Sequence, residues 1–277
     1  MKILMALSHF RKIPSLCKVI IEKTYFYPRL RKELKRYNYG LKKTKKKYSI
    51  QGNKYTQKRH RMHVKIAMEF LKKASSPRKG ERLIAVLIGG GTASGKTTMR
   101  RIIVEKKLKE LNIRAVIVDP DEIKEYIPEY TTLKTKYPND AARLVHKESV
   151  DICELIVKKL IRHRKHFVYE GTMARTKKYK KLVKKLKKAG YEIYVFIADI
   201  PIECAKCRAA ERAKVTGRKI PSHIITKTHS QVPNTFEVIK NLVDRYYVYD
   251  NRNGFVLIAS KDYINPVLYA QFLKKRK

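Results

Sequence analysis

The chain has 277 residues, 43% of them hydrophobic, with 66 Lys and Arg against 24 acidic residues and a formal net charge of +42. This is enough for one α/β core with an appendage, and no run reaches the roughly 20 apolar residues of a membrane span, which excludes such a helix. The charge attracts nucleotides, nucleic acid or acidic membranes without selecting among them. The 4 scattered cysteines exclude a disulfide framework and indicate a reducing compartment, so we expect a cytoplasmic protein.

The beginning of the chain is its most basic part. Residues 1–80 contain 24 Lys and Arg and only 3 acidic residues, with a dense lysine run at 42–47. Such a composition is typical of a solvated or partly disordered segment. We therefore divide the chain into a basic N-terminal extension, residues 1–54, and a folded domain, residues 55–277. We expect the extension to attract nucleic acid or acidic membrane non-specifically.

Helical and extended patterns alternate through the rest of the chain. Met62, Ile66 and Phe70 recur at helical spacing over residues 57–74, with Thr56 as the N-cap. The alternation that follows predicts a parallel sheet sandwiched by helices. In chain order, the predicted strands cover residues 83–88, 115–118, 167–169, 193–197, 248 and 255–258, and the predicted helices cover residues 97–111, 141–163, 177–188 and 202–214.

A glycine-rich motif follows the first strand directly. Residues 90–97 match G-x-x-x-x-G-K-[ST], and the strand before and helix after it are the setting in which backbone N–H groups bind phosphate. We expect Lys96 to reach the β- and γ-phosphates of ATP and the Thr97 hydroxyl to bind Mg²⁺. The predicted ATP-binding residues are Gly90, Gly91, Thr92, Ala93, Ser94, Gly95, Lys96, Thr97 and Thr98.

Acidic residues mark the ends of the second and third strands. Ligands of parallel sheets gather at the carboxyl ends of the strands, which here carry Asp119, Asp121, Glu170 and Thr172. A phosphate-binding loop occurs in GTPases, motors and kinases, but no predicted strand ends in a plain Walker B aspartate. The Asp-x-Asp pair resembles small-molecule kinases, with Asp119 near Mg²⁺ and Asp121 taking the proton of the acceptor hydroxyl. Asp121 is also suited to cap a short helix, and the two roles are compatible.

Arginines after the fourth strand are candidate cations for phosphoryl transfer. Arg208, Arg212 and Arg218 lie in a predicted helix and turn that could close over ATP as a lid. Guanidinium groups there would stabilise the charge of the transition state. In a chain with 66 Lys and Arg residues, ordinary surface arginines are the simpler interpretation. Only comparison with a family singles out Arg212 and Arg218.

The order and spacing of these motifs resemble the zeta-toxin family of P-loop kinases over about residues 55–260. The matching pieces are residues 90–97, 118–124 with 127–130, 168–172 and the lid at 211–218, together with the helix at 55–71 that contains His63. The resemblance implies a P-loop kinase-type α/β fold with a parallel sheet sandwiched by helices, and ATP and Mg²⁺ as cofactors. It also implies catalytic roles for Lys96, Asp121, Arg212 and Arg218.

A substrate and a partner are implied by the same resemblance. The substrate-contacting positions fall on Glu154, Glu170 and Thr172, and bacterial members of the family phosphorylate UDP-N-acetylglucosamine. Toxicity and an antitoxin-like partner protein would follow. This chain departs from the toxins in a shorter lid and in the later position of Arg175. The acceptor therefore stays open to other nucleotide-like molecules, since a fold does not settle a substrate.

Two other hypotheses follow from the charge. One is a kinase of nucleic acid, whose activity should fall steeply with salt because each phosphate contact releases counterions. The other is a non-catalytic protein that binds nucleic acid or an anionic surface and merely contains a nucleotide-binding core. Binding that survives Lys96→Ala and Asp121→Ala but is lost on removal of residues 1–54 would favour this second hypothesis.

Overall fold

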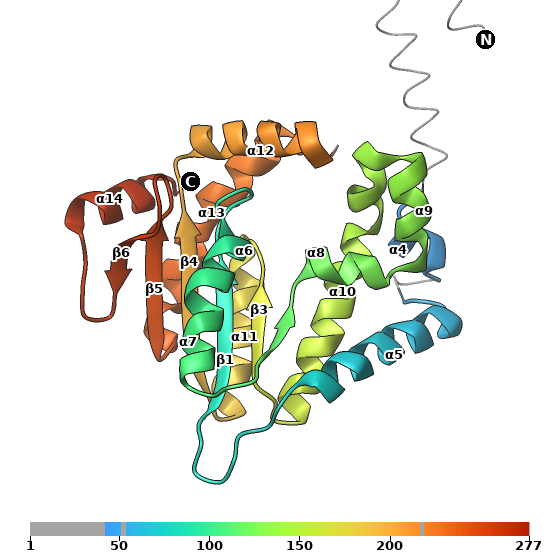
Figure 1. Ribbon diagram of the computed structural model, residues 1–277, viewed down its shortest axis with the longest axis horizontal. Helices are drawn as coiled ribbons and strands as arrows, with labels where there is room; N and C mark the ends of the chain where they lie inside the picture. Colours follow the sequence, from blue (N-terminus) through green and yellow to red (C-terminus); the bar gives the residue numbers. More distant parts are fainter. Residues whose placement is uncertain (1–41, 51–53, 217–218, 277) are drawn as a thin grey trace, which may run out of the picture.

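A six-stranded sheet forms the centre of the protein (Figure 1). The structure is a computed structural model and describes residues 42–50, 54–216 and 219–276. The strand order is β2-β3-β1-β4-β5-β6, in which the first five strands are parallel and β6 pairs antiparallel with β5. The predicted parallel sheet between helices is therefore confirmed. The strands are β1 (Leu83–Gly89), β2 (Val116–Val118), β3 (Phe167–Glu170), β4 (Tyr191–Asp199), β5 (Arg245–Asp250) and β6 (Val256–Ser260).

Strand β1 is buried along its whole length and contributes to two cores. Leu83, Ala85 and Leu87 belong to the larger core, while Ile84 and Ile88 belong to the smaller one. A strand covered on both faces needs a continuous apolar run, which is why this segment shows no polar alternation. The larger core is closed by α5 (Gln57–Lys73), α10 (Pro138–Arg162), α11 (Thr176–Lys188), α13 (Ser222–Ile239) and α14 (Pro266–Lys274).

Helix α5 begins where its sequence predicts and is tied to α10 by a buried carboxylate. The Thr56 side chain accepts a hydrogen bond from the Arg59 N–H at 3.4 Å, which caps the helix. Arg59 Nε and His63 Nε2 both contact Glu148 Oε1, at 2.6 and 2.7 Å. Burial alone would raise the pKa of Glu148, but the hydrogen bonds with His63 and Arg59 outweigh it and lower the pKa to about 2.

A short piece of the basic extension packs on the domain. Helix α4 (Thr44–Tyr48) lies against α10, with Thr44 buried and Lys45 paired to Asp151 at 2.7 Å. The Arg59 guanidinium lies over the Tyr48 ring at 4.0 Å. Most of the extension, residues 1–54, falls outside the described residues. Its partial disorder, its attraction to anions and the domain boundary at residue 55 stay predictions.

The helix after the phosphate-binding loop is interrupted. It consists of α6 (Lys96–Met99), a π-helical segment η4 (Arg100–Val104) and α7 (Glu105–Glu110). Met99 and Val104 are both buried although they are five residues apart, which is the hydrogen-bond period of a π-helix, and Ile102 is 57% exposed. The predicted helix over residues 97–111 is therefore confirmed, and the π-helical turn inside it places both Met99 and Val104 in the smaller core.

Shorter elements follow the remaining strands. β2 leads into α8 (Pro120–Ile123), η5 (Lys124–Tyr126) and α9 (Pro128–Lys136), β4 leads into α12 (Ile202–Thr216), and η6 (Lys240–Leu242) precedes β5. Figure 1 shows α12 at the end of the sheet where the phosphate-binding loop lies. β4 ends two residues later than expected, so one apolar strand does end in an aspartate, the buried Asp199 paired with Lys275. Within the described residues, no helix is long and apolar enough to cross a membrane.

Candidate active site

The phosphate-binding loop joins β1 to α6, and two of its glycines are enclosed by other segments. A Cβ on Gly91 would lie 2.2 Å from the His229 ring. Gly95 has φ +91°, which side-chain-bearing residues rarely adopt, and a Cβ there would lie 2.1 Å from Asn251 Nδ2. That amide donates to the Ser94 carbonyl at 2.9 Å. The glycines are therefore required by close approach of α13 and of the turn after β5.

Helix α13 holds the middle of the loop. The Thr92 N–H donates to Thr228 Oγ1 at 3.1 Å, and His229 Nε2–H donates to the Thr92 carbonyl at 2.9 Å. Burial lowers the pKa of His229 to about 4, so the imidazole is neutral at neutral pH. Sequence reasoning missed both residues, since they lie more than 130 positions from the loop and match no motif.

The loop lysine is influenced by the acidic residues predicted for the site. Lys96 Nζ donates to the Gly91 carbonyl at 2.8 Å. Burial lowers the pKa of Lys96, and the charges of Glu170, Asp121 and Asp119 oppose that shift. The carboxylates that follow β2 and β3 are thus close enough to act on the ammonium group, as the sequence predicts for the carboxyl edge of a parallel sheet.

Thr97 and Glu170 are joined by a hydrogen bond. Thr97 Oγ1 donates to Glu170 Oε1 at 2.8 Å, while the buried Glu170 Oε2 has no hydrogen-bond partner in the described part of the chain. Glu170, expected to contact substrate, therefore lies against the hydroxyl expected to bind Mg²⁺. The other loop residues differ in exposure: Ser94 is fully buried, Ala93 has φ +63°, Gly90 has φ +143° and Thr98 is exposed.

The structure differs from the sequence prediction in which aspartate of the Asp-x-Asp pair caps the following helix. Asp119, not Asp121, caps α8, because the Asp119 carboxylate accepts from the Asp121 N–H at 2.8 Å. Asp119 is 7% exposed, and burial with the nearby charge of Glu170 raises its pKa to about 6. The Asp121 side chain is 49% exposed and pairs with Lys124, which is itself buried. Sequence reasoning missed Lys124, since lysine side chains are normally solvated and no local pattern predicts the burial of this one.

The candidate lid arginines have different surroundings. Arg212 is exposed on α12, and its positive charge is among the influences that lower the pKa of Lys96. Arg208 donates to the carbonyls of Asn251 and Arg252 at 2.8 and 2.9 Å, which ties α12 to the turn after β5. Arg218 lies outside the described residues.

Two predicted substrate positions lie beyond the loop. Glu154 is on α10, and its half-exposed side chain pairs with Lys178 of α11 at 2.7 Å and with Arg175 at 3.9 Å. Thr172 is exposed two residues after β3. Both are accessible to a ligand, and neither is brought against Lys96 by a hydrogen bond or ion pair among the described residues.

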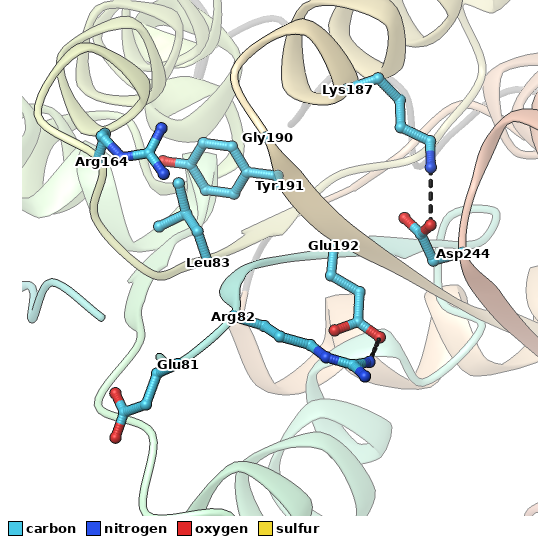
Figure 2. Close-up of a pocket in the computed structure, with 9 residues that line it drawn as sticks. All are labelled: Glu81, Arg82, Leu83, Arg164, Lys187, Gly190, Tyr191, Glu192 and Asp244. Carbon is cyan, nitrogen blue, oxygen red and sulfur yellow. Dashed lines mark hydrogen bonds and ion pairs between the residues drawn. The ribbon is translucent and has the colours of Figure 1, made fainter. Parts of the chain in front are cut away.

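A hollow of about 530 Å³ lies at the opposite end of the sheet, where Leu83 begins β1 and Tyr191 begins β4. Figure 2 shows two ion pairs among its charged side chains, Arg82 with Glu192 and Lys187 with Asp244, whose distances are 3.0 and 2.7 Å. Its lining residues are Glu81, Arg82, Leu83, Arg164, Lys187, Gly190, Tyr191, Glu192 and Asp244. The described residues predicted to bind ATP and to catalyse phosphoryl transfer therefore lie at the opposite end of the sheet from this hollow.

Comparison with known proteins decides the family. A family model described as zeta toxin matches residues 67–262, a span that includes the loop, both acidic segments and α12. The chain belongs to the zeta-toxin family. Toxin PezT of Streptococcus pneumoniae serotype 4 is 34% identical over 110 residues, which are 40% of this chain and 42% of that protein. Toxin zeta of Streptococcus pyogenes is 29% identical over 117 residues, or 42% and 39% of the two chains. The matched stretch thus spans about two fifths of each zeta-toxin relative.

Solved structures agree on the fold. A structure of the PezAT chromosomal toxin-antitoxin system of Streptococcus pneumoniae superposes with TM-score 0.60 at 23% identity, covering 79% of this chain and 88% of that one. The AvrRxo1-ORF1:-ORF2 structure with ATP superposes with TM-score 0.65 at 17% identity, covering 85% and 83%. At these identities the match shows the fold alone, and it confirms the P-loop kinase-type architecture of the zeta-toxin family.

Proposed function

We propose that the protein is an ATP- and Mg²⁺-dependent kinase that phosphorylates a hydroxyl of a nucleotide-sugar or nucleotide-like small molecule. The observation that carries the proposal is the gathering of charge around Lys96, whose ammonium group is influenced by Glu170, Asp121, Asp119 and Arg212. A phosphate-binding lysine with acids for a metal and a base, and with a further cation, is the arrangement that phosphoryl transfer requires.

In the proposed reaction, Asp121 accepts the proton of the acceptor hydroxyl. The hydroxyl oxygen forms a bond to the γ-phosphorus, and the bond from that phosphorus to the bridging oxygen breaks, so ADP leaves with the electron pair. Lys96 and Arg212 stabilise the negative charge on the phosphoryl oxygens, and we assign Arg218 the same task. The half-exposed carboxylate of Asp121 supports its role, because an acceptor can reach it.

Thr97 and Asp119 would hold Mg²⁺, with Glu170 beside them. Hydroxyl and carboxylate oxygens are the ligands that Mg²⁺ prefers. The buried Glu170 Oε2 forms an ion pair with Arg100 Nε at 3.5 Å but accepts no hydrogen bond within the described ranges, so its carboxylate fits a water ligand of the cation. Bound Mg²⁺ would neutralise charge on the transferred phosphate. The raised pKa of Asp119 points the same way, since its anionic form is poorly compensated by the protein itself.

UDP-N-acetylglucosamine is our first candidate for the acceptor. Support comes from membership of the zeta-toxin family, and we assign acceptor contacts to Glu154, Glu170 and Thr172. Toxicity and an antitoxin-like partner protein are proposed on the same ground, because a solved structure of similar fold belongs to a toxin-antitoxin system. A cytoplasmic location completes the proposal, since nucleotide acceptors and ATP are found there.

The test is a transfer assay with Mg²⁺, γ-labelled ATP and a panel of UDP-sugars, nucleotides, NAD and short RNA. We expect label on one small molecule, no transfer by Asp121→Asn with ATP binding retained, and normal transfer by the matched control Asp262→Asn, an exposed and remote position. Full activity of Asp121→Asn would contradict the assigned base. Label on RNA alone would favour a nucleic-acid kinase, and ATP binding without any transfer would contradict an enzyme.

A further inference from the structure

Arg100 is a buried arginine between the acidic segments of the site. It is 2% exposed, and its Nη2 donates to Glu122 Oε1 at 2.7 Å. Its Nε lies 3.5 Å from Glu170 Oε2 and 3.4 Å from Glu105 Oε1. Burial by itself would lower the pKa of Arg100, but the hydrogen bond to Glu122 and the charge of Glu170 reverse that effect and raise it, so the group stays protonated.

These contacts connect three separate segments. Arg100 itself belongs to the helix that carries Lys96 and begins the π-helical segment η4. Glu122 is next to Asp121 in α8, which has only four residues, so holding the Glu122 side chain restrains the backbone that carries the proposed base. Glu170 ends β3 and accepts the hydrogen bond from Thr97.

We propose that Arg100 is a positioning residue that fixes Asp121 relative to the phosphate-binding loop by holding Glu122 and Glu170 with one guanidinium group. The expected effect of Arg100 on catalysis rests on the kinase reaction proposed above. Arg100 reaches the two carboxylates in different ways: Nη2 donates a hydrogen bond to Glu122, and Nε forms an ion pair with Glu170 without a hydrogen bond among the described residues. The planar guanidinium group presents these two nitrogens in fixed directions, whereas an ammonium group is a compact point charge. The role therefore requires arginine rather than any cation.

The kinetic test compares Arg100→Lys with Arg101→Lys, the same exchange at the adjacent exposed position. We expect Arg100→Lys to lower kcat about 100-fold, the effect of roughly 1 Å of misplacement, with the Kd for ATP within twofold of wild type. Glu122→Gln should lower kcat in the same direction, and the double variant should be no slower than Arg100→Lys, because both changes break one link. Three results would overturn the proposal. The Arg100→Lys variant could keep the wild-type kcat, its lower kcat could be explained by weaker ATP binding, or the losses of kcat in Arg100→Lys and Glu122→Gln could add up in the double variant.

A second measurement does not depend on catalysis. Hydrogen exchange of the nucleotide-free variants should be faster in Arg100→Lys than in Arg101→Lys at peptides that cover α8, and unchanged at β1. Equal exchange at α8 would overturn the proposal even if the kinase is confirmed. Faster exchange at α8 in a protein that transfers no phosphate would refute the kinase and keep the positioning role. If Arg100→Lys does not fold, Glu122→Gln, a change at a 47% exposed side chain, supports the proposal by the same two readouts or overturns it by normal ones.

Discussion

Replacing Asp119 by Asn should stabilise the nucleotide-free protein at neutral and alkaline pH. The folded protein raises the pKa of this carboxyl from 3.8 to about 6, through burial and the charge of Glu170. A raised carboxyl pKa favours folding below the unfolded value, and that stability is lost as the pH rises through the folded value. A shift of about 2 units corresponds to about 3 kcal/mol, and asparagine keeps the oxygen that caps α8 while it removes the charge.

The assay is thermal unfolding of wild type and Asp119→Asn without nucleotide across the pH range. The gain should grow between about pH 4 and 6 and level off above, where 3 kcal/mol corresponds to a rise in Tm of roughly 6 to 12 °C. Asp262→Asn, at an exposed position, should show no such gain. An Asp119→Asn protein that is no more stable than wild type at pH 8, or that is equally stabilised at every pH, would refute the reasoning. The same variant should bind Mg²⁺ with ATP more weakly.

Other predictions concern the loop, the lid and the tie between α5 and α10. Gly91→Ala should weaken ATP binding at least about tenfold in calorimetry, because its Cβ would meet the His229 ring, and His229→Ala in the same chain should restore part of the affinity. Arg212→Ala should lower kcat about 100-fold with ATP affinity retained, and an unchanged rate would make it a surface arginine. Glu148→Gln should cost about 3 kcal/mol in urea unfolding at pH 7.5, since it leaves Arg59 with less compensation. That cost should shrink as the pH falls from 4.5 towards 2, and a cost independent of pH would contradict the lowered pKa of Glu148.

The sequence predicts the helices and strands correctly where they are determined by residues close together in the chain. The sequence correctly predicts the apolar run of β1, the amphipathic α5 with its Thr56 cap, and the helix α11. These elements depend on side-chain periodicity and on hydrogen bonds within a few residues. One prediction went wrong where a local pattern allows two answers: Asp119, not Asp121, caps α8.

The phosphate-binding motif and the placement of Lys96, Asp119 and Asp121 near one another follow from the sequence by itself. A strand, a glycine loop and a helix in succession specify a phosphate site, and parallel strands bring their carboxyl ends to one edge. Only the tertiary structure decided that α13 encloses the loop through His229, and that Arg100 lies buried between acidic segments. Burial and ion pairing of a charged side chain depend on segments that are distant in the chain. The pattern of residues within one segment therefore cannot predict them.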